Sequence, residues 1–124
     1  MYEIAVDETF AAAHNLREYQ GKCEDLHGHN YKLRVVLEGK ELDSTGLLYD
    51  FVHLKKVIHG VIQTLDHKYL NELPPFDKLN PSAENIARHI FDETSKNLLK
   101  APNAPRISSV TVWETDTSAA TYRA

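Results

Sequence analysis

The chain has 124 residues, of which 14 are Lys or Arg and 18 are Asp or Glu, so that its formal charge is −4. Because no segment carries a basic stripe, this balance argues against nucleic acid as the main partner. Hydrophobic residues make up 42% and charged residues 26%, which excludes a disordered chain. The single Cys excludes an intrachain disulfide, no apolar run approaches the roughly 20 residues that cross a bilayer, and the N-terminus lacks the basic start of a signal peptide. We therefore expect one cytoplasmic domain, residues 1–124, that binds neither a membrane nor nucleic acid.

Two segments with alternating apolar side chains predict β-strands at the start of the chain. In residues 2–14 and, more cleanly, in residues 27–37, every second side chain is mostly apolar or histidine. We expect these segments to form an antiparallel pair joined by the loop 15–26. A short strand is expected to follow near residues 47–49.

Two helices and two further strands are predicted next. Asp50 is typical of an N-cap and opens a helix to about Leu65, and Ser82 caps a second amphipathic helix. Strands are then expected over residues 107–114 and 119–123. The order ββ–αα–ββ predicts an α+β fold with both helices on one face of an antiparallel sheet. Since four long strands leave two exposed edges, pairing of these edges between subunits would give a closed barrel and a homo-oligomer.

Three of the seven histidines are predicted to meet at one end of the first strand pair. His27 and His29 flank Gly28 on one face of a strand, and His14 ends the preceding antiparallel strand. Three neutral imidazoles that leave a fourth position open are typical of a catalytic zinc site, whereas structural sites are mostly closed by Cys. The alternative, ordinary half-buried strand residues, is less favoured by this spacing. The other histidines of the predicted helices are expected at the solvated surface: His53, His59 and His89.

The only thiol, Cys23, lies four residues before His27 in the loop that must pass over this site. A nearby cation would lower the pKa of the thiol and produce a thiolate that can act as a base or a nucleophile. Free cysteines are also often buried and inert. The residues alone leave both roles open.

Acidic side chains at two positions could complete the site. Asp66 precedes His67 at the end of the first helix, where it could orient the imidazole, although a histidine there is more often a favourable partner of the helix dipole. Glu114 shares the inward parity of its strand and therefore needs a partner. That partner is either a ligand with N–H donors or Arg123 across the final hairpin.

Six short motifs follow one another along the chain: Phe10-x-Ala12-Ala13-His14-x-Leu16, Cys23-x-x-x-His27-Gly28-His29-Asn30-Tyr31, Thr45-Gly46-x-x-x-Asp50-Phe51, Leu65-Asp66-His67-x-x-Leu70-Asn71, Asn80-Pro81-Ser82-x-Glu84-Asn85 and Glu114-Thr115. Each motif is weak alone. In this order and spacing they cover essentially the whole chain, which resembles the 6-pyruvoyl-tetrahydropterin synthase / QueD family.

The resemblance implies the tunnelling fold, in which subunits join into a β-barrel with active sites at their interfaces. It implies a homo-hexamer built as a dimer of trimers. By the same resemblance His14, His27 and His29 would bind the cofactor Zn²⁺. Ser82 and Glu84 would contact the substrate.

The catalytic roles are likewise implied by the resemblance. Cys23 would accept a proton, with Asp66 and His67 in a relay at the same site. Glu114 would anchor the amino-pyrimidine edge of the pterin. This arrangement would hold the reacting part of the substrate beside both the metal and the thiol.

The four-residue step from Cys23 to His27 resembles the bacterial 6-carboxytetrahydropterin synthase (QueD) branch. Animal pyruvoyl-type enzymes usually have a longer gap, and a branch with Glu in place of Cys is disfavoured. The resemblance thus implies a zinc-dependent lyase of queuosine biosynthesis that converts 7,8-dihydroneopterin triphosphate to 6-carboxy-5,6,7,8-tetrahydropterin, acetaldehyde and triphosphate. The alternatives are 6-pyruvoyl-tetrahydropterin synthase and a non-catalytic zinc- and pterin-binding module. The candidate cations for the triphosphate are unranked: Arg17, Lys22, Lys32 and Arg123.

Overall fold

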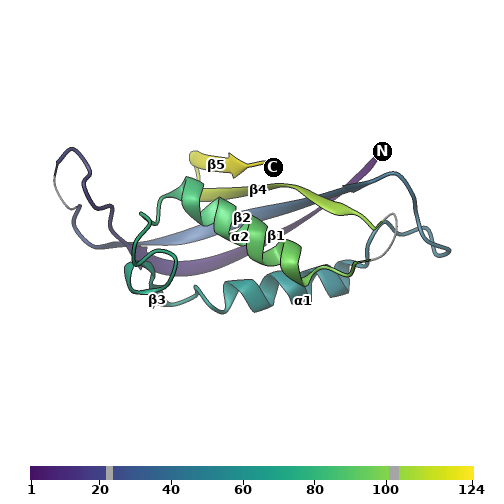
Figure 1. Ribbon diagram of the computed structural model, residues 1–124, viewed down its shortest axis with the longest axis horizontal. Helices are drawn as coiled ribbons and strands as arrows, with labels where there is room; N and C mark the ends of the chain where they lie inside the picture. The colour runs from purple at the N-terminus through teal and green to yellow at the C-terminus, as the bar shows by residue number, and fades with distance from the viewer. Residues whose placement is uncertain (22–23, 101–103) are drawn as a thin grey trace.

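The computed structural model describes residues 1–21, 24–100 and 104–124 (Figure 1). In chain order its elements are β1 (Tyr2–His14), β2 (His27–Gly39), α1 (Phe51–Ile62), β3 (Lys68–Tyr69), the 3-10 helix η1 (Leu70–Glu72), α2 (Ala83–Asn97), β4 (Arg106–Thr115) and β5 (Ser118–Tyr122). The four long strands and both helices of the prediction are therefore confirmed. No helix in these three ranges is long and apolar enough to cross a bilayer.

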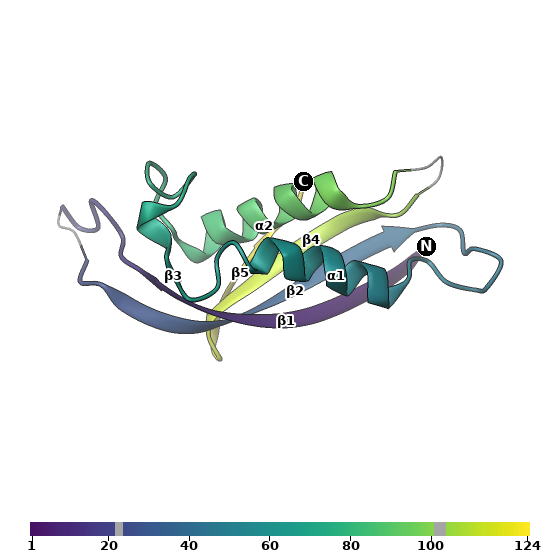
Figure 2. The same ribbon diagram turned by 90° about the horizontal axis from the view of Figure 1, so that it is seen from below.

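The strands form one sheet in the order β3-β1-β2-β4-β5, and both helices pack on the same face of it (Figures 1 and 2). β1 and β2 pair antiparallel along their whole length, from Tyr2 opposite Gly39 to His14 opposite His27. This register follows from the alternation of β2, whose inward side chains from Tyr31 to Leu37 are fully buried. The open end of the hairpin therefore brings His14 next to His27.

The four long strands pair antiparallel as predicted, but the unpredicted β3 pairs parallel with β1 and makes the sheet mixed. Two residues are too few to produce an alternating pattern in the sequence. The pairing is set instead by contacts made in the fold: the Ala11 amide donates to the Asp66 carboxylate over 2.9 Å, and the His67 amide donates to the Ala11 carbonyl over 2.6 Å.

The short strand expected near residues 47–49 is not formed. Asp43 closes a turn there, because its carboxylate accepts the amides of Thr45 and Leu47 at 2.8 and 3.0 Å. The amide of Leu47 is thus already paired within the turn.

The helix starts follow the predicted caps. The Asp50 carboxylate accepts the Val52 amide at 2.7 Å, and the Ser82 hydroxyl accepts the Asn85 amide at 3.2 Å. α1 ends at Ile62, three residues before the expected end, and the backbone continues as turns to β3. This early end places Asp66 beside β1.

Two of the three helical histidines are not solvated surface residues as expected. His59 is exposed, but His53 and His89 are half-buried. The His89 ring packs edge-on against Phe76, with ring centroids 5.2 Å apart, and lines a cavity of about 660 Å³ between α1 and α2. Burial lowers the pKa of His89, with Glu93 and Asp92 opposing the shift.

We expect His89 to make the folded protein less stable in acid. Folding lowers the pKa of His89, so the neutral ring contributes fully to the free energy of unfolding above the unfolded-state pKa of about 6.5. This contribution is lost as the pH falls from there through the lower pKa of the folded state. His89→Leu should therefore lose less unfolding free energy than the wild type between about pH 7.5 and about pH 5.5. Urea unfolding in the presence of a chelator measures this difference. An identical acid dependence in the two proteins would contradict the assignment.

Candidate metal and active site

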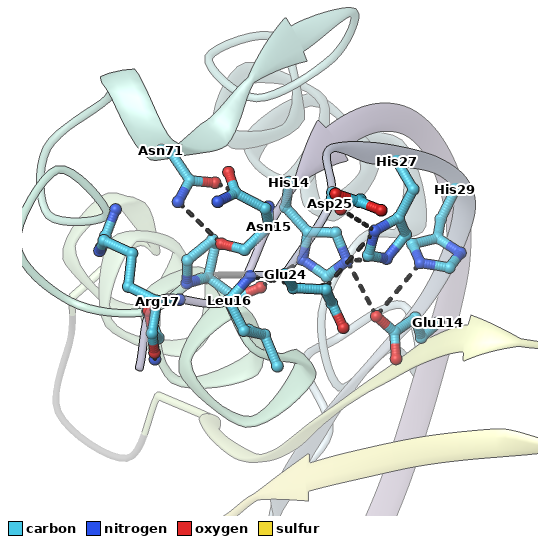
Figure 3. Close-up of polar contacts among 12 residues, drawn as sticks. His14, Asn15, Leu16, Arg17, Glu24, Asp25, His27, His29, Asn71 and Glu114 are labelled. Atoms are coloured by element: carbon cyan, nitrogen blue, oxygen red, sulfur yellow. Dashed lines mark hydrogen bonds and ion pairs between the residues drawn. The ribbon is translucent and has the colours of Figure 1, made fainter. Parts of the chain in front are cut away.

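The three imidazoles predicted to converge do so at the open end of the β1–β2 hairpin (Figure 3). His14 is the last residue of β1, and His27 and His29 are the first and third residues of β2, so that all three lie on the helix-covered face. His14 is 1% exposed, and its Nε2 atom lies 3.1 Å from Nε2 of His27. The antiparallel register alone brings this about, because it sets His14 opposite His27.

Hydrogen bonds fix the tautomers of two of these rings. Nδ1–H of His14 donates to the Pro81 carbonyl over 2.7 Å, and Nδ1–H of His27 donates to the Asp25 carbonyl over 2.9 Å. Since a carbonyl oxygen only accepts, the neutral form of each ring has its lone pair on Nε2, and these two Nε2 atoms face each other. Burial lowers the pKa of His29, with the Glu114 carboxylate opposing the shift. Such a group of nitrogen acceptors needs a cation between them.

Glu114 of β4 completes the group with a carboxylate oxygen. Its Oε1 atom lies 3.0 Å from Nε2 of His14 and 3.2 Å from Nε2 of His29. The ligand atoms of Glu114 and the three histidines all lie within 4.8 Å of one another. Three neutral imidazoles and a carboxylate are a donor set that suits Zn²⁺, so these residues could hold the metal ion implied by the sequence.

The pairing of β4 with β2 sets Trp113 opposite Lys32, and Glu114 follows on the inward face that it shares with Val112. Trp113 pairs with Ala119 and Thr115 pairs with Ser118, so that Glu114 is the extra residue of a bulge. The alternative partner of Glu114 was Arg123, which comes directly after the end of β5 at Tyr122. Because Tyr122 pairs with Val110, Arg123 lies at the far end of the β4–β5 hairpin from Glu114.

The segment that leaves His14 is held by two asparagine side chains that sequence reasoning missed. The Asn71 side chain accepts the backbone N–H of Asn15 at 3.0 Å and donates to the Asn15 carbonyl over 2.8 Å (Figure 3). Asn80 pairs in the same way with both backbone groups of Arg17 at 2.8 Å. Each side chain thus bonds both the N–H and the C=O group of one residue, as the backbone of a neighbouring strand does. Both asparagines stand in the sequence motifs, but nothing in their spacing indicated these partners.

Asp66 and His67 lie together, as their adjacency suggested, but apart from the imidazole group. Nδ1 of His67 is 3.0 Å from the Asp66 carboxylate, and the Ala11 amide together with His67 lowers the pKa of Asp66. His67 is 82% exposed and has a left-handed backbone with a φ of 58°. Among the described residues no hydrogen bond or ion pair joins this Asp–His pair to the imidazoles, although His67 and His29 line one hollow of about 480 Å³.

Ser82 and Glu84 lie at the start of α2, next to the Pro81 carbonyl that holds His14. Ser82 is half-buried and caps the helix, and Glu84 is exposed in the first turn. Their expected contacts with a substrate stay predictions. Cys23 falls outside the described residues, so its expected role as a proton acceptor is likewise a prediction.

The candidate cations for a triphosphate differ in what they contact. The Arg17 guanidinium donates to the Phe76 carbonyl over 2.7 Å. Lys32 lies on the sheet face opposite the imidazoles, 3.6 Å from the Asp7 carboxylate and over the Trp113 ring. Lys22 falls outside the described residues. Lys32 is thus disfavoured for a ligand bound at the imidazoles of the same protomer.

The fold and the site define an α+β protein whose first strand pair ends in a group of metal-ligand side chains. The chain belongs to the 6-pyruvoyl tetrahydropterin synthase family, whose sequence profile matches residues 3–124. It is 36% identical to the 6-carboxy-5,6,7,8-tetrahydropterin synthase of Bacillus subtilis (strain 168), over 98% of this chain and 85% of that protein. It is 39% identical to the dihydroneopterin monophosphate aldolase of Pyrococcus furiosus, over 86% of this chain and 83% of that protein.

A solved structure of Caenorhabditis elegans 6-pyruvoyl tetrahydropterin synthase superposes on the protein with a TM-score of 0.84 at 28% sequence identity. The superposition covers 99% of this chain and 95% of that one. A structure of the Plasmodium vivax synthase, 23% identical, gives a TM-score of 0.79 over 98% of this chain and 96% of that one. The predicted α+β tunnelling fold of the single chain is therefore confirmed, and its assembly into a β-barrel stays a prediction.

Proposed function

We propose that the protein is a zinc-dependent 6-carboxy-5,6,7,8-tetrahydropterin synthase that acts on 7,8-dihydroneopterin triphosphate in queuosine biosynthesis. The observation that carries the proposal is the group of three imidazoles and one carboxylate, in a protein 36% identical to the Bacillus subtilis enzyme of that name. Two further bacterial relatives with this name are 37% and 35% identical over nearly the whole sequence.

In this proposal His14, His27 and His29 hold the zinc ion through their Nε2 atoms. Bound zinc supplies a Lewis acid that polarises the hydroxyl oxygens of the substrate and acidifies the neighbouring C–H and O–H groups. Pro81 and Asp25 hold two of the rings by their Nδ1–H groups, which keeps the Nε2 lone pairs directed at the same point.

The remaining roles fall to four side chains. Cys23 as a thiolate removes a proton from the hydroxylated tail of the substrate, and His67, oriented by Asp66, carries protons at the same site. Glu114 accepts the N–H groups of the amino-pyrimidine ring and fixes the substrate's orientation. Because Asp66 and His67 lie apart from the imidazoles within one protomer, we propose that a second copy completes the site in a homo-hexamer.

A product assay tests the proposal. Zinc-loaded protein is incubated with 7,8-dihydroneopterin triphosphate, and the pterin products are identified by mass while released aldehydes are trapped. We expect 6-carboxytetrahydropterin and acetaldehyde. A pterin that loses triphosphate but keeps all three carbons of its tail would instead identify a 6-pyruvoyl-type synthase.

A second candidate function is favoured by the relative from Pyrococcus furiosus, which is a dihydroneopterin monophosphate aldolase. The same assay with 7,8-dihydroneopterin monophosphate tests it, since an aldolase cleaves a carbon–carbon bond in the tail of the pterin and leaves the phosphate on the aldehyde. Cleavage of the monophosphate without conversion of the triphosphate would replace our proposal. A protein that binds zinc but converts neither compound would be a non-catalytic module.

A further inference from the structure

We propose that Glu114 is a displaceable fourth ligand of the metal ion: it closes the site when no pterin is bound and leaves the metal when the pterin binds. This inference rests on the proposed function for the identity of the displacing ligand. The metal-ligand role of Glu114 itself rests on the geometry of the described residues alone.

Three of the six distances between ligand atoms in the group are close to the edge of a coordination tetrahedron, and all six lie within 4.8 Å. Ligands at about 2.0–2.1 Å from a zinc ion in tetrahedral geometry lie about 3.3 Å from one another. The observed distances are 3.1 Å between Nε2 of His14 and His27, 3.0 Å between His14 and Glu114, and 3.2 Å between His29 and Glu114. With three imidazoles on the ion, the Glu114 carboxylate would be the fourth ligand, which would make the resting site closed.

The four side chains differ in how firmly they are held. Backbone carbonyls fix the rings of His14 and His27, and His14 is almost fully buried. Glu114 is 32% exposed and lies in a bulge, and no hydrogen bond to another described residue besides the imidazole contacts holds its carboxylate. Of the four, Glu114 is thus the side chain that can leave the metal at least cost.

Metal binding and pterin binding compete for the same oxygens. An amino-pyrimidine edge offers parallel N–H donors, which a carboxylate pairs best with both of its oxygens. When Oε1 ligates the metal, only one oxygen remains for this pairing. A ligand that carries the amino-pyrimidine edge therefore draws Glu114 away and opens a coordination position for its own hydroxyl oxygens, whereas a polyol or a phosphate without that edge does not.

Cobalt(II) substitution tests this inference without turnover. Co²⁺ absorbs strongly in four-coordinate sites and weakly at higher coordination numbers, so its visible spectrum reports the ligand set. We expect the wild type to give a four-coordinate spectrum that changes when neopterin is added and does not change with glycerol or inorganic triphosphate. An unchanged wild-type spectrum at saturating neopterin would overturn the displacement, and this measurement needs no variant.

Glu114→Gln tests the ligand role separately, with Glu3→Gln on the exposed edge of β1 as the matched control. Glu114→Gln should weaken Zn²⁺ binding at least about tenfold in competition with a chelator and change the resting cobalt spectrum, whereas Glu3→Gln should do neither. Unchanged zinc affinity and an unchanged spectrum in Glu114→Gln would overturn the ligand role. Failure of the product assay alone would refute the proposed function and leave these two results in place.

Discussion

Replacing His29 by alanine should weaken zinc binding more than about 100-fold, since the loss of a ligand costs more than the loss of a residue that only orients one. Nε2 of His29 is buried, lies 3.2 Å from Glu114 and has no hydrogen bond to another described residue, so a metal ion is the partner that it lacks. Because a metal bound only by the folded protein stabilises it, added zinc should raise the Tm of the wild type and have little effect on the variant.

His59→Ala is the matched control for this experiment. It removes an imidazole of the same kind from the exposed face of α1, where the only hydrogen bond of the ring among the described residues is with Gln63 at 3.1 Å. Equilibrium dialysis of chelator-treated proteins against zinc measures both affinities. If His29→Ala bound zinc as tightly as His59→Ala, the imidazole group would not be the metal site.

The histidine group could be predicted from the sequence because only local patterns are needed to build it. Alternation assigns His27 and His29 to one face of a strand, and an antiparallel pair brings the end of the preceding strand, His14, to the same place. The inward direction of Glu114 also followed from parity. Its distance from the imidazoles did not, because that depends on the register between β4 and β2, which the hydrophobic pattern of β4 alone does not fix.

The features that were missed depend on contacts between segments far apart in sequence. β3 is a strand only because Asp66 and His67 bind the backbone of Ala11, 55 and 56 residues earlier. The pairing of Asn71 with the backbone of Asn15 is of the same kind, and an asparagine near a turn has many other possible partners. Tertiary contacts override local preference at such places, so the pattern of single segments could not reveal them.

The proposed base leads to the second large effect: Cys23→Ala should lower kcat by about 10²–10⁴-fold, the usual contribution of a positioned general base, and leave zinc affinity unchanged. The change removes the thiolate but none of the four side chains of the metal group. Turnover of 7,8-dihydroneopterin triphosphate and zinc competition measure the two effects on the same preparation. Near-wild-type turnover in Cys23→Ala would exclude the thiol as the base.

Glu24→Gln identifies the base if the thiol fails, because Glu24 is an acidic neighbour of Cys23. The Glu24 carboxylate lies 3.5 Å from Nδ1 of His27 and accepts the Leu16 amide at 3.4 Å, so it contacts both the metal group and the segment that leaves His14. With Cys23 as the base, Glu24→Gln should reduce turnover far less than Cys23→Ala, since it removes a charge beside His27 and leaves the thiolate in place. The reverse order of the two effects would transfer the proton-accepting role to the carboxylate of Glu24.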